Sequence, residues 1–210
     1  GPIETIYRFA RSADDIADSE DLPSEFKRDR LTFFRSELKK IECDEPTLTP
    51  LFSELGGLIV RHELPISLFF QLLDAFERDL TVHRYENFNQ LQDYCAHSAN
   101  PIGRLLLHLF GHTNEEYFKW SDSICTSLQI INFLQDIKDD YDLGRVYLPK
   151  DEMDSFGVTE NHIKHRTFDV NWLNFMSFQL ERARQYLHDG TELYRKLPGR
   201  MGIEIKTIVK

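Results

Sequence analysis

The sequence is poor in the features that mark secreted, membrane-spanning and nucleic-acid-binding proteins. Its 210 residues include three cysteines, Cys43, Cys95 and Cys125, too far apart for a CxxC pair, which predicts a reducing compartment and no disulfide framework. No apolar run approaches the roughly 20 residues that a membrane-spanning helix needs. Lysine and arginine total 25 against 35 aspartates and glutamates, a formal net charge of −10. Nucleic acid is therefore not an expected partner.

Strand patterning is also nearly absent. Apolar residues recur with a helical period of about 3.6 through most of the chain, whereas strict alternation is rare. We predict one all-α domain over residues 1–210. The expected helices cover residues 1–18, 24–41, 51–62, 65–81, 88–110 with an interruption at Pro101, 115–141, short pieces near 151 and 159, 170–197, and a last one from about 201. No secretion signal is recognised at the start, and we expect a cytoplasmic protein.

The stretch QIINFLQDIKDDYDLGRVYLP, residues 129–149, carries the first motif that packing alone does not explain. Its polar residues at i, i+3, i+7 and i+11 are two amides and two carboxylates: Gln129, Asn132, Asp136 and Asp140. This spacing places them on one helix face, and Gly144 is expected to end the helix. Two carboxylates one turn apart suit a hard divalent cation better than a packing surface.

A second copy of this arrangement lies near the start of the chain, in YRFARSADDIAD. Here a phenol, a guanidinium and two carboxylates occupy positions i, i+4, i+7 and i+11: Tyr7, Arg11, Asp14 and Asp18. One DxxxD pair in an acidic protein is ordinarily a solvated helix face. Two such pairs, each with aligned polar neighbours, indicate a functional site.

These motifs resemble those of the squalene and phytoene synthases, the isoprenyl synthases that join prenyl chains head to head. In that family two Asp-rich helices face each other across a cavity and hold magnesium against a prenyl diphosphate. The motif at residues 129–140 is followed by the family signature GRVYLP at residues 144–149. The likeness covers nearly the whole chain. Within the family, ARSADDIAD and DYCAHSANPIGRLLLHLFG most resemble the bacterial hopanoid-pathway branch, the hydroxysqualene synthases.

The resemblance implies an enzyme with the α-helical isoprenoid synthase fold, a central cavity, and further helices beyond both ends of this chain. It implies conversion of presqualene diphosphate to hydroxysqualene by ionisation, carbocation rearrangement and water capture. Two or three Mg²⁺ ions and no NADPH are expected. The expected partner is the substrate, presqualene or farnesyl diphosphate, and peripheral contact with the inner face of the membrane is expected for product release.

Two alternatives stay open. The chain could be a squalene- or phytoene-type synthase that condenses two prenyl diphosphates, or a non-catalytic relative that keeps the helical shell as an assembly or binding module. A non-catalytic relative is expected to lose motif carboxylates, and all four are present here. The sequence does not specify an oligomeric state.

The resemblance also assigns roles within the motifs. The expected metal ligands are Asp14, Asp18, Asp136 and Asp140. The expected diphosphate-binding residues are Tyr7, Arg11, Gln129, Asn132, Arg145 and Tyr147. Each assignment has a simpler alternative: Arg11 could form an i,i+3 ion pair with Asp14, worth about 0.2–0.5 kcal/mol, Arg145 could pair with a nearby aspartate, and the two amides could be ordinary buried polar groups.

The stretch after Tyr94 departs from the usual family pattern of valine, alanine and glycine. Here Ser98 and Asn100 precede Pro101, which must break the helix and free a backbone carbonyl. That carbonyl, Ser98 and Asn100 could hold one ordered water in a cavity that Tyr94 also lines. Asn100 would then be catalytic, because the water would capture the carbocation. Alternatively, Asn100 only satisfies the backbone that Pro101 disrupts.

Overall fold

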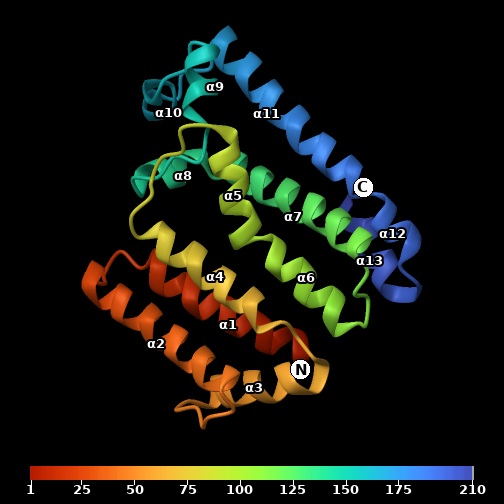
Figure 1. The fold of residues 1–210 in the computed structure, drawn as a ribbon. Helices are drawn as coiled ribbons and strands as arrows, with labels where there is room; N and C mark the ends of the chain where they lie inside the picture. The colour runs from red at the N-terminus through yellow and green to blue at the C-terminus, as the bar shows by residue number, and fades with distance from the viewer. Residues whose placement is uncertain (210) are drawn as a thin grey trace. The chain divides into compact units, whose positions relative to one another are not determined.

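The structure, a computed structural model, describes residues 1–209 and confirms the all-α prediction (Figure 1). The extended pairing among these residues is one isolated parallel bridge between Arg84 and Val146. None of the described helices is long and apolar enough to cross a bilayer. The helices are α1 (Pro2–Asp18), α2 (Ser24–Glu42), α3 (Pro50–His62), α4 (Ile66–Asp79), α5 (Phe88–Ser98), α6 (Asn100–Leu109), α7 (Glu115–Gln135), α8 (Ile137–Asp142), α9 (Lys150–Ser155), α10 (Glu160–His165), α11 (Val170–Asp189), α12 (Glu192–Lys196) and α13 (Gly199–Val209).

The chain forms two compact units. The first comprises residues 1–82 and 101–113, and the second comprises residues 83–100 and the chain from 114 onward. The α5 and α6 helices meet at Ala99, immediately before Asn100 and Pro101. This break confirms the interruption expected at Pro101, since proline is tolerated in the first turn of a helix but not in its interior.

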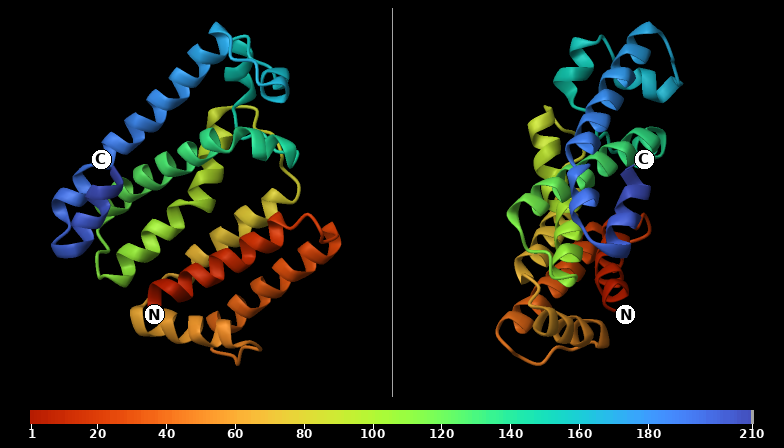
Figure 2. Two further views of the ribbon diagram at one scale, coloured as in Figure 1. Left: turned by 180° about the vertical axis from the view of Figure 1, so that it is seen from behind. Right: turned by 90° about the vertical axis from the view of Figure 1, so that its right-hand side faces the viewer.

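The first unit is built around α1, which packs against α2, α3 and α4 (Figure 2). The apolar side of α1 is fully buried at Phe9, whose ring makes edge contacts with Phe52 at 6.0 Å and Phe69 at 5.3 Å between centroids. Ile6 and Ala13, three and four residues from Phe9, are buried with it. Burial of this stripe leaves the other side of α1 for polar residues.

The second unit is built around α7 and α11, which lie side by side (Figure 2). The buried Ser127 hydroxyl of α7 donates a hydrogen bond of 2.7 Å to the carbonyl of Ala183 on α11. At the end of α11 a Cβ on Gly190 would lie 2.4 Å from Ile124 Cγ1 and 2.7 Å from the Trp120 carbonyl. Glycine is required there because the two helices approach closely.

Two predicted helices are interrupted. The prediction of one helix over 170–197 is wrong, because α11 ends at Asp189 and α12 begins at Glu192, with the close approach of Gly190 to α7 between them. The helix predicted over 115–141 breaks at Asp136, whose φ of −99° and ψ of 11° are not helical. Aspartates are weak helix formers and are favoured in a first turn, and Asp139 and Asp140 lie in the first turn of α8, which begins at Ile137.

Candidate active site in two aspartate-rich segments

The first aspartate-rich segment lies on the polar side of α1. Tyr7, Arg11 and Asp18 are exposed and Asp14 is half-buried, so their side chains are open to a ligand. The neighbouring positions Ile6, Phe9 and Ala17 are held in the core. The core contacts therefore fix which side of α1 carries the motif.

Arg11 forms ion pairs within its own helix. Its Nη1 lies 3.2 Å from Asp14 Oδ2 and its Nη2 lies 2.8 Å from Asp15 Oδ1. This is the simpler alternative considered for Arg11, extended to the neighbouring Asp15. The arginine side chain is 56% exposed, and ion pairs this exposed contribute at most about 1 kcal/mol. A ligand with stronger acceptors could therefore recruit Arg11.

The second aspartate-rich segment crosses the break between α7 and α8. Gln129 is half-buried, Asn132 and Asp136 are exposed, and Asp140 is half-buried. The helical hydrogen bonds continue across the break, from the Asp136 amide to the Asn132 carbonyl at 2.9 Å and from the Asp140 amide to the Asp136 carbonyl at 2.8 Å. The two carboxylates thus stay one turn apart, although they do not share one uninterrupted helix.

A glycine turn connects this segment to the GRVYLP loop (residues 144–149). Gly144 has a φ of 81°, its amide donates to the Tyr141 carbonyl at 2.9 Å, and the Arg145 amide donates to the Asp140 carbonyl at 2.8 Å. This pair of bonds is the Schellman motif that ends many helices. It joins the backbone of Arg145 directly to that of Asp140.

His83 lies near Arg145 and Arg84. The pKa of His83 is lowered by burial first, and then by the positive charges of Arg145 and Arg84. His83 is joined to the loop because its carbonyl accepts a hydrogen bond of 2.9 Å from the Val146 amide. The charge of Arg84 is balanced by its ion pair with Glu160.

Tyr147 and Tyr94 lie in a buried aromatic cluster. The Tyr147 ring stacks on Phe133 at 4.2 Å and 8°, and it lies 5.7 Å from the Tyr94 ring and 5.8 Å from the Tyr85 ring. Tyr147 is 7% exposed. Its stacking holds the end of the GRVYLP loop in the core, and its contact with diphosphate stays a prediction.

The residues before Pro101 form a small buried polar cluster. Asn100 is 9% exposed, and its Oδ1 accepts a hydrogen bond of 3.1 Å from the Thr126 hydroxyl on α7. The buried Ser98 hydroxyl oxygen has no hydrogen-bond partner among the described residues. This bond uses the Asn100 acceptor and not its amide donors, which are the groups that a freed carbonyl would bond. Sequence reasoning missed Thr126, because no local pattern links positions 26 residues apart.

The carboxylates fit magnesium in number and type. Within residues 1–209 no three Asp, Glu, His or Cys side chains are grouped as a complete metal site. Mg²⁺ is usually held by one or two carboxylates and completes its shell with phosphate oxygens and water. Asp14 and Asp18 in the first unit, and Asp136 and Asp140 in the second, each supply such a pair.

Comparison with known proteins identifies the family. The family model described as squalene/phytoene synthase matches residues 2–210. The hydroxysqualene synthase of Zymomonas mobilis is 39% identical over 161 residues, which is 75% of this chain and 52% of that protein. The hydroxysqualene synthase of Rhodopseudomonas palustris is 34% identical over 210 residues, 98% of this chain and 70% of that protein.

Solved structures agree with this result. The squalene synthase HpnC of Alicyclobacillus acidocaldarius superimposes with a TM-score of 0.90 at 32% identity, covering 98% of this chain and 76% of that one. A dehydrosqualene synthase, at 20% identity and a TM-score of 0.84, shares the fold. The expected isoprenoid synthase fold is confirmed, although the chain spans only about half of the Zymomonas relative. The chain belongs to the squalene/phytoene synthase family.

Proposed function

We propose that this chain is the helical core of a magnesium-dependent enzyme that converts presqualene diphosphate to hydroxysqualene. The observation that carries the proposal is the pair of aspartate-rich segments in a chain that matches a hydroxysqualene synthase over 98% of its length. Matches to phytoene synthases are more distant, at 31% identity over 74% of the chain. All four motif carboxylates are present, which a non-catalytic relative would not need.

The residues of the two segments would bind and orient the diphosphate. Bound magnesium would act as a Lewis acid that stabilises the departing diphosphate. Arg11 would exchange its exposed pairs with Asp14 and Asp15 for diphosphate oxygens, because charge-assisted, two-pronged hydrogen bonds are stronger than exposed ion pairs. That exchange would release Asp14 from its ion pair with Arg11. Tyr7 would share this side of α1.

The second segment, on α7, α8 and the GRVYLP loop, would supply diphosphate contacts of its own. Gln129 and Asn132 offer amide donors to phosphate oxygens. Arg145 offers a guanidinium, and its backbone is bonded to that of Asp140. Tyr147 would keep the end of the GRVYLP loop in place through its aromatic stack.

The cluster near Pro101 would determine the product. Loss of diphosphate leaves a carbocation, and a water oxygen that bonds to the cationic carbon and releases one proton gives an alcohol, so no reductant is consumed. Buried polar groups almost always have hydrogen-bond partners, and the Ser98 hydroxyl has none among the described residues. We propose that Ser98 and Asn100 hold that water in the part of the cavity lined by Tyr94, with Thr126 orienting Asn100.

A second candidate activity is condensation of two prenyl diphosphates to a squalene- or phytoene-type product. The matched structure named squalene synthase HpnC supports it. The test is incubation of the full-length protein and magnesium with presqualene diphosphate or farnesyl diphosphate, each with and without NADPH, followed by product identification. The proposal requires hydroxysqualene from presqualene diphosphate in both conditions. Squalene formed only with NADPH would support the second candidate instead.

The location of the enzyme is part of the proposal. Hydroxysqualene is a long apolar molecule, so we propose that the enzyme works in the cytoplasm and releases product in peripheral contact with the inner face of the membrane. Co-sedimentation with zwitterionic lipid vesicles tests this contact, because the chain has a net charge of −10 and anionic vesicles would repel it. Protein that stays in the supernatant would contradict it.

A further inference from the structure

We propose that Arg84 is a positioning residue for the GRVYLP loop, and that through this loop it sets the orientation of Arg145 toward the diphosphate. The inference rests on the proposed function, because it gives Arg84 a part in diphosphate binding. Arg84 belongs to neither aspartate-rich segment. Its side chain nevertheless contacts the residue immediately before Arg145.

The segment around Arg84 runs beside the loop. The amides of Val146, Lys150 and Asp151 donate to the carbonyls of residues 83, 85 and 86 at 2.9, 2.9 and 3.0 Å. Arg84 and Val146 form the isolated parallel bridge. Short paired segments outside a sheet are marginally stable by themselves, so side-chain contacts have to hold this pairing in place.

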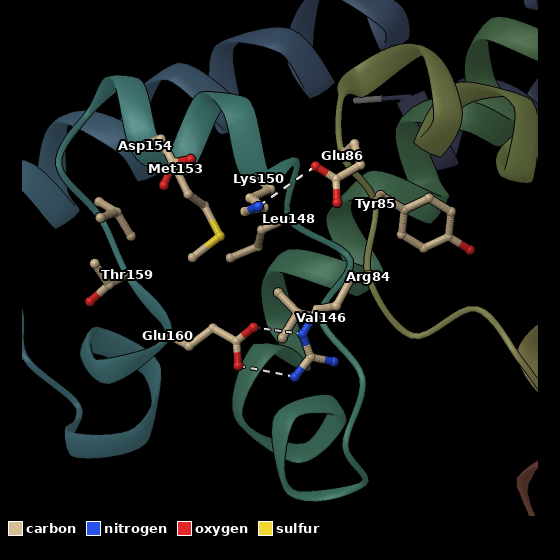
Figure 3. A pocket seen from close by; sticks show the side chains of 11 residues that line it. Arg84, Tyr85, Glu86, Val146, Leu148, Lys150, Met153, Asp154, Thr159 and Glu160 are labelled. Atoms are coloured by element: carbon tan, nitrogen blue, oxygen red, sulfur yellow. Dashed lines mark hydrogen bonds and ion pairs between the residues drawn. The ribbon is translucent and has the colours of Figure 1, made fainter.

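The Arg84 guanidinium supplies such contacts. Its Nη1 donates to the carbonyls of Gly144 at 2.6 Å and His83 at 2.8 Å. Its Nε and Nη2 donate to the two carboxylate oxygens of Glu160 at 2.6 and 3.0 Å (Figure 3). One side chain therefore ties together its own segment, the start of the GRVYLP loop and the first turn of α10.

These bonds restrain the backbone on both sides of Arg145. The carbonyl before it accepts from Arg84, its own amide donates to the Asp140 carbonyl, and the next amide donates to the His83 carbonyl. With three successive backbone groups held, the direction in which the Arg145 side chain leaves the loop is set. A displacement of about 1 Å in a substrate-positioning group can lower a rate by roughly 100-fold.

The Arg84–Glu160 ion pair is too exposed to matter much for the stability of the fold. Arg84 and Glu160 lie on the wall of an open pocket of about 360 Å³ whose apolar lining includes Val146, Met153 and Val158 (Figure 3). Their side chains are 38% and 43% exposed, and ion pairs this exposed contribute little to folding stability. Loss of Arg84 should therefore disturb the loop more than it destabilises the fold.

The test compares Arg84→Lys and Arg84→Gln in the full-length protein. Lysine keeps the charge but cannot replace a guanidinium that bonds a carboxylate and two carbonyls at once. The matched control is Arg35→Gln, which removes a two-pronged pair with Glu77 in the first unit. The measurements are hydrogen exchange at the Val146 amide, calorimetric affinity for inorganic pyrophosphate with magnesium, kcat and KM with presqualene diphosphate, and melting temperature.

Both Arg84 variants should exchange the Val146 amide about tenfold faster and bind pyrophosphate about tenfold more weakly, with kcat reduced 10- to 100-fold. Their melting temperatures should fall no further than that of Arg35→Gln. Unchanged Val146 exchange, full activity of Arg84→Lys, or activity lost only in proportion to melting temperature would each overturn the inference. Faster exchange in the variants, with no pyrophosphate binding by the wild type, would instead overturn the proposed function.

Discussion

The backbone amide of Arg145 donates a hydrogen bond of 2.8 Å to the carbonyl of Asp140. This bond closes the glycine turn at Gly144 and links the expected metal ligand Asp140 to the expected diphosphate ligand Arg145. The two roles are therefore coupled through the backbone as well as through any shared ligand. A change in the turn should affect both.

Replacing Gly144 with alanine should impair activity through the backbone alone. The position has a φ of 81° and open space where a Cβ would lie, so the cost is the conformational strain of an L-residue, about 1–2 kcal/mol. Gly111→Ala is a matched control, since Gly111 has a φ of 74° and open space in the same kind of turn outside the motifs. Comparable melting temperatures with activity lost only in Gly144→Ala are expected. Equal activities would contradict the coupling.

Removing a motif carboxylate should abolish turnover without unfolding the helices. We expect Asp14→Asn or Asp136→Asn to lower kcat by at least 100-fold, because each removes a charged oxygen ligand from magnesium. Helical circular dichroism should stay near that of the wild type. Asp142→Asn is the control, since that aspartate pairs with Lys138 on the same helix. Near-normal turnover of Asp136→Asn would remove it from the site.

Magnesium and diphosphate should stabilise the protein together. Each completes the other's coordination shell, so the rise in melting temperature with both should exceed the sum of the separate rises. Thermal melts with magnesium, with pyrophosphate and with both measure this directly. Strictly additive shifts would count against a shared site.

The cluster near Pro101 should control the product more than the stability. Ser98→Ala removes a buried hydroxyl that bonds no described protein group, so no protein partner is left unsatisfied and stability should change little. The alcohol fraction of the product should fall, as it should in Asn100→Gly. Ser127→Ala is the control, because its buried hydroxyl bonds the Ala183 carbonyl. It should lose about 1 kcal/mol and keep the alcohol. Unchanged product in both Ser98→Ala and Asn100→Gly would refute the proposed water site.

His83 should titrate below its usual pKa. Burial, Arg145 and Arg84 all disfavour its charged form in the folded protein. Below about pH 6.5 the unfolded chain therefore binds more protons than the folded chain, and stability is lost as the pH falls from that value through the lower pKa of folded His83. Proton NMR of the His83 ring should give a midpoint below 6.5, and Arg84→Gln should raise it. A midpoint above 6.5 in the wild type would contradict this account.

The sequence was sufficient to predict features that depend on neighbours along the chain. The helical spacing of Tyr7, Arg11, Asp14 and Asp18 predicts that they share one side of α1, and the structure buries Ile6, Phe9 and Ala13 on the other side. Gly144 ends α8 as expected because it alone can adopt a positive φ there at low cost. The break before Pro101 follows from the chemistry of proline.

Features that depend on distant contacts could not be predicted in this way. The break at Gly190 follows from its approach to Ile124, a residue on another helix. Arg84 reaches Gly144 and Glu160, which lie 60 and 76 positions away, and no local pattern indicates either contact. The break at Asp136 falls inside an apolar helical pattern, which masks the weak helix propensity of the aspartates.

The most direct test of the central claim is the origin of the oxygen in the product. The full-length protein is supplied with presqualene diphosphate and magnesium, without NADPH, in water labelled with heavy oxygen, and the product is analysed by mass spectrometry. If the carbocation is captured by water, hydroxysqualene should form and carry the heavy oxygen in its hydroxyl group. No alcohol, or an alcohol without the label, would contradict the account.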